Sequence, residues 1–355
     1  MNKKQKQAHL ACEQAIIGKI QATRHAIKFI GQVVVSFLKM RTSNLAVIAN
    51  AMESSVKPDS NYKQIQRFLK SFRWRQSGFE KFQLEFLGIS GRVDVLIDRT
   101  EWKFGRVWIN ILTVSVYYRG LSIPISWKVF SKKGNLSGCK HALVLRDVVR
   151  KLGRERVGKV YADREFCNRE FIGYLYENDL DFCIRLKKNY LADGISFKEL
   201  LVRQSLRIKL KGKRKYCVLG YEMGVSCVRL SEAEYLIVGT REVEPRAFVE
   251  YEKRWGIETL LGCLKSRGFD FEQTHLTKRA RIERLMFLLS LAYCLAIKTG
   301  DIKTKGQAIR RKNHGRRVKS LFRIGLDYLQ NLLVNLHIIA KWNEFNILAK
   351  LLSCT

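Results

Sequence analysis

The chain has 355 residues and carries 66 Lys and Arg against 32 Asp and Glu, which gives a formal net charge of +34. Because this excess runs through the whole chain and exceeds what solubility needs, it predicts a polyanion, above all DNA, as the partner. A membrane protein is also disfavoured, because the longest apolar runs span about a dozen residues and are too short to cross a bilayer.

Cysteine and histidine usage argues against a zinc site or a disulfide framework. The nine cysteines form no CxxC pair and the six histidines are scattered. The basic start, MNKKQKQ, lacks a following apolar signal stretch. We therefore expect a cytoplasmic, nucleoid-associated protein with no membrane partner and with enough apolar residues for one large or several smaller folded units.

Residues 1–90 are expected to form a basic helical domain. Apolar residues recur at helical spacing, and the turn-rich segment SSVKPDSN separates the last two helices. The expected helices are 11–20, 27–38, 44–52 and 62–72. The last of them carries Lys63 and Arg67, so the final pair suits a helix-turn-helix-like DNA reader. A small helical bundle without DNA contacts would give the same pattern.

From Gly91 onward, apolar residues recur at every second position, which predicts strands. Three strands joined by the short turns KFGR and YYRG indicate an antiparallel meander, after which helices and strands alternate. The expected strands are 93–98, 107–116, 121–129, 159–162 and 182–186, and the helices between the last three strands are 141–152 and 170–178. This order predicts an α/β domain over residues 91–298, built on a mixed sheet with helices on its faces.

Two aspartates, Asp98 and Asp163, are expected at the C-terminal ends of neighbouring strands. Carboxylates placed there can meet at one edge of the sheet and bind a metal ion. Asp94 lies on the same face of its strand as Asp98 and is the main rival for the first position, with Glu101 and Glu165 behind it. An Asp at a strand end is also a common turn former, so each position has a purely structural alternative.

A helix is expected over the segment YEKRWGIETLLGCLK and its flanks, about 20 residues in all. At about 100° per residue, Tyr251, Arg254, Glu258 and Lys265 fall within an arc of roughly 60° beside an apolar stripe, so they face one way. The alternative is a purely structural one: a surface ion pair between Arg254 and Glu258, which would contribute only a few tenths of a kcal/mol to stability.

Glu258 can join Asp98 and Asp163 if this helix crosses the same edge of the sheet. Three convergent carboxylates suit two hard divalent cations about 3.5–4 Å apart, which activate a water or a 3′-hydroxyl and stabilise the leaving oxygen of a phosphodiester. Arg254 and Lys265 would then offset the negative charge of the phosphate, Arg254 as a fork and Lys265 as a point charge.

Several of these segments together resemble the DDE transposases of bacterial insertion sequences. The segments are DRTEWKFG from Asp98, YADREF around Asp163, and the series Tyr251, Arg254, Glu258, Lys265 followed by SRGFDFEQTHLT. The series matches the subgroup with the signature Y-(2)-R-(3)-E-(6)-K. The resemblance implies a ribonuclease-H-like catalytic fold with a β-strand insertion, cleavage at the inverted-repeat ends of the element, and strand transfer into target DNA.

Carried over residue by residue, the resemblance implies that Asp98, Asp163 and Glu258 bind two Mg²⁺ ions, with Mn²⁺ able to substitute. The signature residues that would contact phosphates close to the cut are Tyr251, Arg254 and Lys265. The other expected DNA contacts are Arg185, Lys187, Lys63 and Arg67. Transposases of this kind act as paired molecules, so a homodimer is expected in the active complex.

The segment 189–241 fits the β-strand insertion. Its expected strands are 207–210, 216–221, 226–230 and 235–240. In relatives that excise through a DNA hairpin, an aromatic residue of the insertion, often Trp, stacks on a flipped base, but here no Trp occurs between Trp127 and Trp255. Tyr190, Tyr216 or Phe197 could replace it because stacking needs only a flat ring. Packing on a strand face is the favoured alternative for all three.

The last part of the chain, 299–355, begins with a basic run at 302–319 and continues in an amphipathic helix at 321–352. We expect this helical segment to contact DNA or a second subunit. Two alternatives to a transposase stay open: a ribonuclease-H-like nuclease without strand transfer, and a catalytically inactive DNA-binding relic. Pure DNA binding would tolerate Asn or Gln at the three carboxylate positions.

Overall fold

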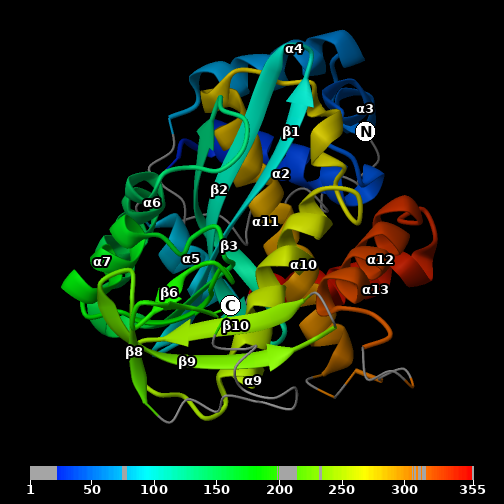
Figure 1. Cartoon of the computed structure of the whole chain (residues 1–355). Helices are drawn as coiled ribbons and strands as arrows, with labels where there is room; N and C mark the ends of the chain where they lie inside the picture. Colours follow the sequence, from blue (N-terminus) through cyan, green and yellow to red (C-terminus); the bar gives the residue numbers. More distant parts are fainter. Residues whose placement is uncertain are drawn as a thin grey trace.

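The structure is a computed structural model (Figure 1) and describes residues 22–73, 78–197, 199, 214–231, 234–305, 307, 309–310, 313 and 317–353. The expected helix at 11–20 and the expected strand at 207–210 lie outside these residues, as does part of the basic run at 302–319.

One mixed sheet of eight strands organises the chain, in the order β3-β2-β1-β4-β5-β10-β9-β8. The parallel pairs are β1 with β4 and β4 with β5, and the other neighbours are antiparallel. The strands are β1 (Val93–Phe104), β2 (Val107–Tyr118), β3 (Leu121–Phe130), β4 (Val157–Ala162), β5 (Asp181–Arg185), β8 (Lys215–Val218), β9 (Tyr221–Arg229) and β10 (Tyr235–Thr240). The predicted α/β, ribonuclease-H-like mixed sheet is confirmed, including the three-stranded meander.

The insertion extends the main sheet, which its sequence did not indicate. After a small hairpin of β6 (Leu191–Ala192) and β7 (Ile195–Ser196), the chain returns so that β10 pairs with β5 through Val238 and Arg185. The backbone hydrogen bonds of β5 are therefore continued into the insertion.

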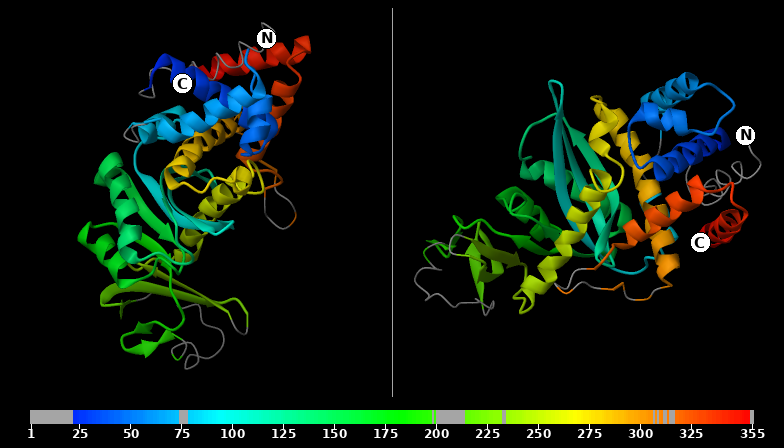
Figure 2. Two further views of the ribbon diagram at one scale, coloured as in Figure 1. Left: turned by 90° about the horizontal axis from the view of Figure 1, so that it is seen from above. Right: turned by 90° about the vertical axis from the view of Figure 1, so that its right-hand side faces the viewer.

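Helices cover both faces of the sheet (Figures 1 and 2). Helices α6 (Gly138–Leu152) and α7 (Arg169–Glu177) cover one face; α9 (Ala247–Tyr251), α10 (Trp255–Leu264) and α11 (Arg279–Thr304) lie on the other. Because successive residues of a strand point to opposite faces, Val95 and Ile97 of β1 enter the core with α6 and α7. Leu96 and Trp102 enter the core with α10 and α11.

The N-terminal helices pack against the C-terminal part of the chain. They are α2 (Arg24–Met40), α3 (Leu45–Ala51), α4 (Pro58–Ser71) and α5 (Phe79–Phe86). Helix α2 contacts both α11 and α12 (Leu321–Val334), and Figure 2 shows the N- and C-terminal helices together at the end of the molecule away from β8. The apolar residues of these helices form one continuous core with α10 and α11.

The single helix predicted over 321–352 is wrong. Helix α12 ends at Val334, where the N–H of Asn335 bonds the carbonyls of Asn331 and Leu332, and α13 (Ile339–Ser353) starts after a turn. The apolar period alone did not reveal this break, because both helices keep an apolar face toward the same core.

Helix α11 is long and apolar enough, by length and composition, to cross a membrane. However, 83% of its most apolar window is buried inside the protein. It is the central core helix, between the sheet and the terminal helices, as its apolar sequence predicted.

His141 of α6 predicts a pH dependence of stability. Its ring is fully buried against Phe166 and Phe171, and neither ring nitrogen has a hydrogen-bond partner in the part of the chain that the structure describes. Burial, helped by the charge of Arg99, lowers the pKa of His141 from 6.5 to about 4. Between these values the unfolded chain binds a proton that the folded chain does not, so stability is lost as the pH falls. We expect the unfolding free energy to drop by about 3 kcal/mol from this residue.

Denaturant unfolding followed from pH 7 to pH 4 checks this expectation. The loss of stability should be clearly shallower in His141→Asn than in the wild type, because the variant lacks the titrating ring. Parallel curves for the two proteins would show that another group dominates the acid range.

Candidate functional site

Asp98 and Asp163 lie beside each other because β1 and β4 run parallel. Ile97 pairs with Ala162 across these strands, and β4 ends there, so Asp163 leaves the sheet next to Asp98. The prediction that Asp98 ends its strand is wrong: β1 continues to Phe104, and Asp98 pairs with Thr113 of β2. It thus occupies a fixed position on a continuous strand, whereas Asp163 begins a turn.

The environment of Asp98 disfavours its negative charge. Burial, helped by the nearby carboxylates of Glu165 and Asp163, raises its pKa to about 7. The N–H of Arg99, which donates to Asp98 Oδ1 at 2.8 Å, and the charge of Arg254 oppose this rise. The surroundings of Asp98 therefore favour its neutral form, and a neighbouring cation would favour its charged form.

The helix predicted around 251–265 is not continuous. Helix α9 ends at Tyr251, a 3-10 turn η2 (Glu252–Arg254) follows, and α10 starts at Trp255. A Cβ on Gly256 would lie 2.9 Å from the carbonyl oxygen of Leu121, so the glycine lets α10 lie tightly against β3. These segments lay the helix across the sheet next to the aspartates.

Tyr251 and Arg254 are the residues of this segment that reach the aspartates. The hydroxyl of Tyr251 donates to Asp163 Oδ1 at 3.2 Å. Arg254 is 6% exposed, lies over the Tyr251 ring, and its charge acts on Asp98 and Asp163. Its Nη1 pairs with Glu258 Oε1 at 2.7 Å, while its Nε has no partner among the described residues. Arg254 thus links Glu258 to the two aspartates.

The donor set fits a divalent ion in part. The adjacent carboxylates of Asp98 and Asp163 supply the oxygen ligands that such ions prefer. Over the described part of the chain, however, no three His, Cys, Asp or Glu side chains are grouped closely enough to hold a metal. Glu258 is half exposed and bound to Arg254 instead.

The rivals of these carboxylates all have other partners. Asp94 accepts hydrogen bonds from Lys253 Nζ at 2.8 Å and from the N–H of Lys159 at 3.1 Å. Glu165 binds Arg99 Nε at 2.8 Å, and Glu101 binds Arg99 and the N–H of Gly134. Each of them has a structural partner that offsets its charge.

Lys253 and Tyr161 form a network that the sequence did not point to. Tyr161 is fully buried in β4 and donates to Glu250 Oε2 at 2.6 Å. Lys253 Nζ bonds Asp94 at 2.8 Å, Glu250 at 2.9 Å and the Tyr161 hydroxyl at 3.3 Å. Since Lys253 lies between Tyr251 and Arg254 in sequence, the network anchors η2 to β1 and β4. The only signal in the sequence was a lysine beside the signature residues.

Lys253→Met should therefore disturb the site without removing any residue that faces it. We expect a loss of about 1–2 kcal/mol in unfolding free energy, because the half-buried carboxylates of Asp94 and Glu250 lose their ion pairs with Lys253. The DNA cleavage that the resemblance implies should fall more than DNA binding, because Tyr251 and Arg254 shift. Lys253→Arg should restore most of both in unfolding and cleavage assays. If Arg restored stability but not cleavage, Lys253 would have a role other than anchoring.

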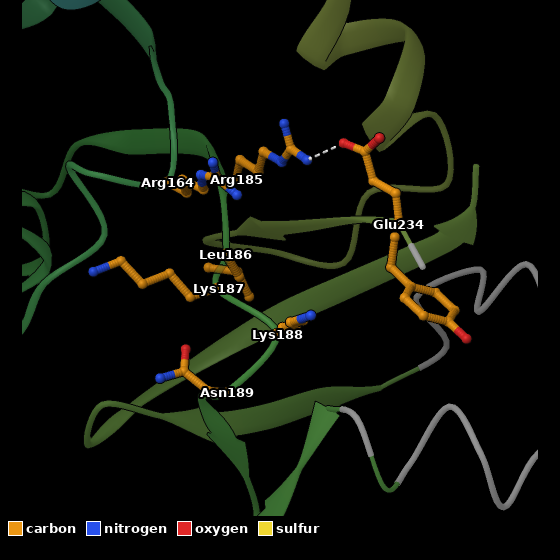
Figure 3. Close-up of a pocket in the computed structure, with 8 residues that line it drawn as sticks. Arg164, Arg185, Leu186, Lys187, Lys188, Asn189 and Glu234 are labelled. Atoms are coloured by element: carbon orange, nitrogen blue, oxygen red, sulfur yellow. Dashed lines mark hydrogen bonds and ion pairs between the residues drawn. The ribbon is translucent and has the colours of Figure 1, made fainter. Parts of the chain in front are cut away.

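A basic pocket of about 370 Å³ opens where β5 and β10 meet (Figure 3). Its lining includes four basic side chains and one acidic one: Arg164, Arg185, Lys187, Lys188 and Glu234. Arg185 Nη2 pairs with Glu234 Oε1 at 3.1 Å. The charge of Arg185 also acts on the Tyr251 hydroxyl. Two of the expected DNA contacts, Arg185 and Lys187, thus lie together near the aspartates.

The remaining expected DNA contacts lie apart from this centre. Lys265 follows the end of α10 and pairs with Glu272 at 2.5 Å. Lys63 and Arg67 are exposed on α4, in the N-terminal helices.

The three candidate stacking aromatics of the insertion differ in exposure. Phe197 is buried in the core shared with α6 and α7. Tyr190 is half-buried and donates to the carbonyl of Cys167. Tyr216 is half-buried beneath Arg214, whose guanidinium lies 4.5 Å from its ring centre. All three rings pack against other parts of the protein, which agrees with the packing alternative and not with a free stacking ring.

Comparison with protein families finds a match. Residues 89–295 match the family described as the transposase DDE domain, a range that contains the aspartates, the insertion and α10. No curated protein matches the chain.

Proposed function

The chain belongs to the DDE transposase domain family, whose members bind DNA and generally use divalent metal ions, and from this premise we propose that it cuts the ends of its own insertion sequence and joins them to target DNA. The observation that carries this proposal is the meeting of Asp98, Asp163, Tyr251 and Arg254 at the edge of the sheet. The net charge of +34 supports a DNA substrate.

Each residue has a proposed part in the reaction. Asp98, Asp163 and Glu258 hold two Mg²⁺ ions, for which Mn²⁺ substitutes; Glu258 joins once its carboxylate leaves Arg254. The chemistry supplied by the bound ions is activation of the attacking oxygen and stabilisation of the leaving oxygen.

The basic residues receive the DNA. Arg254, freed from Glu258, turns its guanidinium fork to the phosphate, and its Nε already has no partner within the described residues. Tyr251 holds Asp163 in place through its hydroxyl. Arg185 and Lys187 bind the backbone next to the cut, Lys265 a phosphate further along α10, and Lys63 and Arg67 the element end. Two subunits form the active complex in the cytoplasm, at the nucleoid.

Cleavage of a labelled linear fragment that contains the flanking DNA of the gene tests the proposal. In Mg²⁺, the wild type should make specific cuts at the repeat ends, and Glu258→Gln should not, while both bind the fragment equally. Supplying unlabelled plasmid then shows whether the cut ends are joined to it.

Three results would contradict parts of the proposal. Specific cutting without joining would favour a nuclease of the same fold. Binding without cutting by either protein, in Mg²⁺ or Mn²⁺, would favour a DNA-binding relic. Cutting that survives Glu258→Gln would mean that another residue completes the carboxylate set.

A further inference from the structure

The hairpin of β1 and β2 extends well past the aspartates. From Asp98 to Phe104 the strand advances about 20 Å at roughly 3.3 Å per residue. Phe104 pairs with Val107, and Gly105 turns the chain with a φ of 56°, which leaves Arg106 exposed at the outermost point. The loop after α10, including His275, lies against this tip, as the stacking of His275 on Phe104 shows.

The tip carries positive charge without acidic partners. Lys103, Arg106, Lys132 and Lys133 are all exposed, and none of them forms an ion pair with a described residue. Glu101, the acidic residue of this part of β1, is already bound by Arg99 and by the N–H of Gly134. Because no described acidic side chain pairs with these cations, an outside anion meets no competitor among the described residues.

Aromatic rings hold part of this charge in place. Lys133 Nζ lies 5.3 Å and Lys103 Nζ 6.0 Å from the centre of the Trp108 ring. On the other side of the tip, the rings of Phe104 and His275 stack at 4.7 Å with an angle of 10°. Lysines restrained over a ring lose less side-chain entropy when they bind a phosphate than free lysines do.

We propose that this hairpin tip, defined as Lys103–Val107 with Trp108, Lys132, Lys133 and His275, binds the phosphate backbone of duplex DNA that runs through the active site. At roughly 3.4 Å per base pair, a distance of about 20 Å from Asp98 places the contact about six base pairs from the cut. This inference rests on the proposed function for the position of the cut, but the binding itself requires no cleavage.

A charge-matched pair of variants tests the contact. The tip variant is Lys103→Gln with Arg106→Gln, and the control is Lys81→Gln with Arg150→Gln, which removes the same charge from exposed side chains of α5 and α6. Binding of fluorescent duplexes is measured by anisotropy at several salt concentrations. The tip variant should bind about 10-fold more weakly, and its salt slope should fall by about two, since each lost phosphate contact removes about 0.9. The control should stay within about twofold.

The length of the duplex gives a second readout. With element-end DNA cut back to fewer than about four base pairs beyond the cleavage position, the tip variant and the wild type should bind equally. Equal binding of long duplexes by the tip and control variants, or a tip defect that persists on the shortest duplex, would overturn the proposal. Thermal unfolding of both variants shows whether the fold is intact.

Activity assays then identify which DNA lies on the tip. Slow cutting with normal joining of precut ends identifies the flank of the element, and normal cutting with slow joining identifies target DNA. A wild-type protein that binds through the tip but never cuts would refute the proposed function and leave the tip contact standing.

Discussion

Asp98→Asn should lower the rate of DNA cleavage at least about 1,000-fold while leaving DNA affinity nearly unchanged. The strand register explains the size of the effect: Ile97 and Ala162 are partners, so Asp98 and Asp163 share one small volume with Arg254. Replacing one carboxylate by an amide keeps the shape but removes one of the proposed metal ligands. Single-turnover cleavage of the end-labelled fragment, with binding measured in parallel, gives both numbers.

Asp94→Asn is the matched control, four residues earlier on the same face of β1. Asp94 is bonded to Lys253 and to the N–H of Lys159, so its loss should reduce cleavage by no more than about 10-fold, through the anchoring of η2. If Asp94→Asn were as damaging as Asp98→Asn, the assignment of the first carboxylate would have to be reversed.

Gly325→Ala should lower the unfolding free energy by about 3 kcal/mol or more. Helices α11 and α12 cross so closely that a Cβ at Gly325 would lie 1.7 Å from the carbonyl oxygen of Ala296 and 2.6 Å from the N of Gly300. Both neighbours are backbone atoms of a buried helix, so the helices would have to separate and open the core around Leu326. Denaturant unfolding measures the loss.

Gly262→Ala provides a helical control for this prediction. The three atoms nearest to the added Cβ in α10 all belong to the guanidinium of Arg267, which is the far end of a flexible, exposed side chain. Stability should therefore stay within about 1 kcal/mol of the wild type, or rise slightly because Ala favours the helix. Equal losses in the two variants would indicate that the α11–α12 crossing yields more easily than the distances suggest.

The sequence predicted most elements of the sheet but not how they combine. Alternating apolar residues located most of these strands, since each strand has a buried face. The predicted strands 216–221 and 226–230 are wrong in their bounds, because the chain turns at residues 219–220 and β9 runs without a break from Tyr221 to Arg229. That β10 pairs with β5 depends on contacts between distant segments, which periodicity does not encode. The length of β1 beyond Asp98 was missed for a related reason: its polar residues Arg99 and Glu101 find partners in neighbouring loops.

For the candidate site, the spacing in the sequence predicted which residues lie close together but not which partners they bind. Tyr251, Arg254 and Glu258 share a helical repeat, so their proximity could be expected even though a 3-10 turn divides the segment. The pairing of Arg254 with Glu258, and the anchoring of η2 by Lys253 and Tyr161, depend on tertiary contacts. Local spacing carries no information on which partner a charged side chain chooses.

The pairing of β5 with β10 bears on how such a protein can be shortened or rebuilt. An insertion attached only at its two ends could be deleted and replaced by a short linker. Here the deletion would strip Cys183, Ile184 and Arg185 of their backbone partners Thr240, Gly239 and Val238. The central sheet would then end in a bare strand, ready to pair with another copy of itself. A minimal version of this enzyme would therefore have to keep β10 or supply another strand in its place.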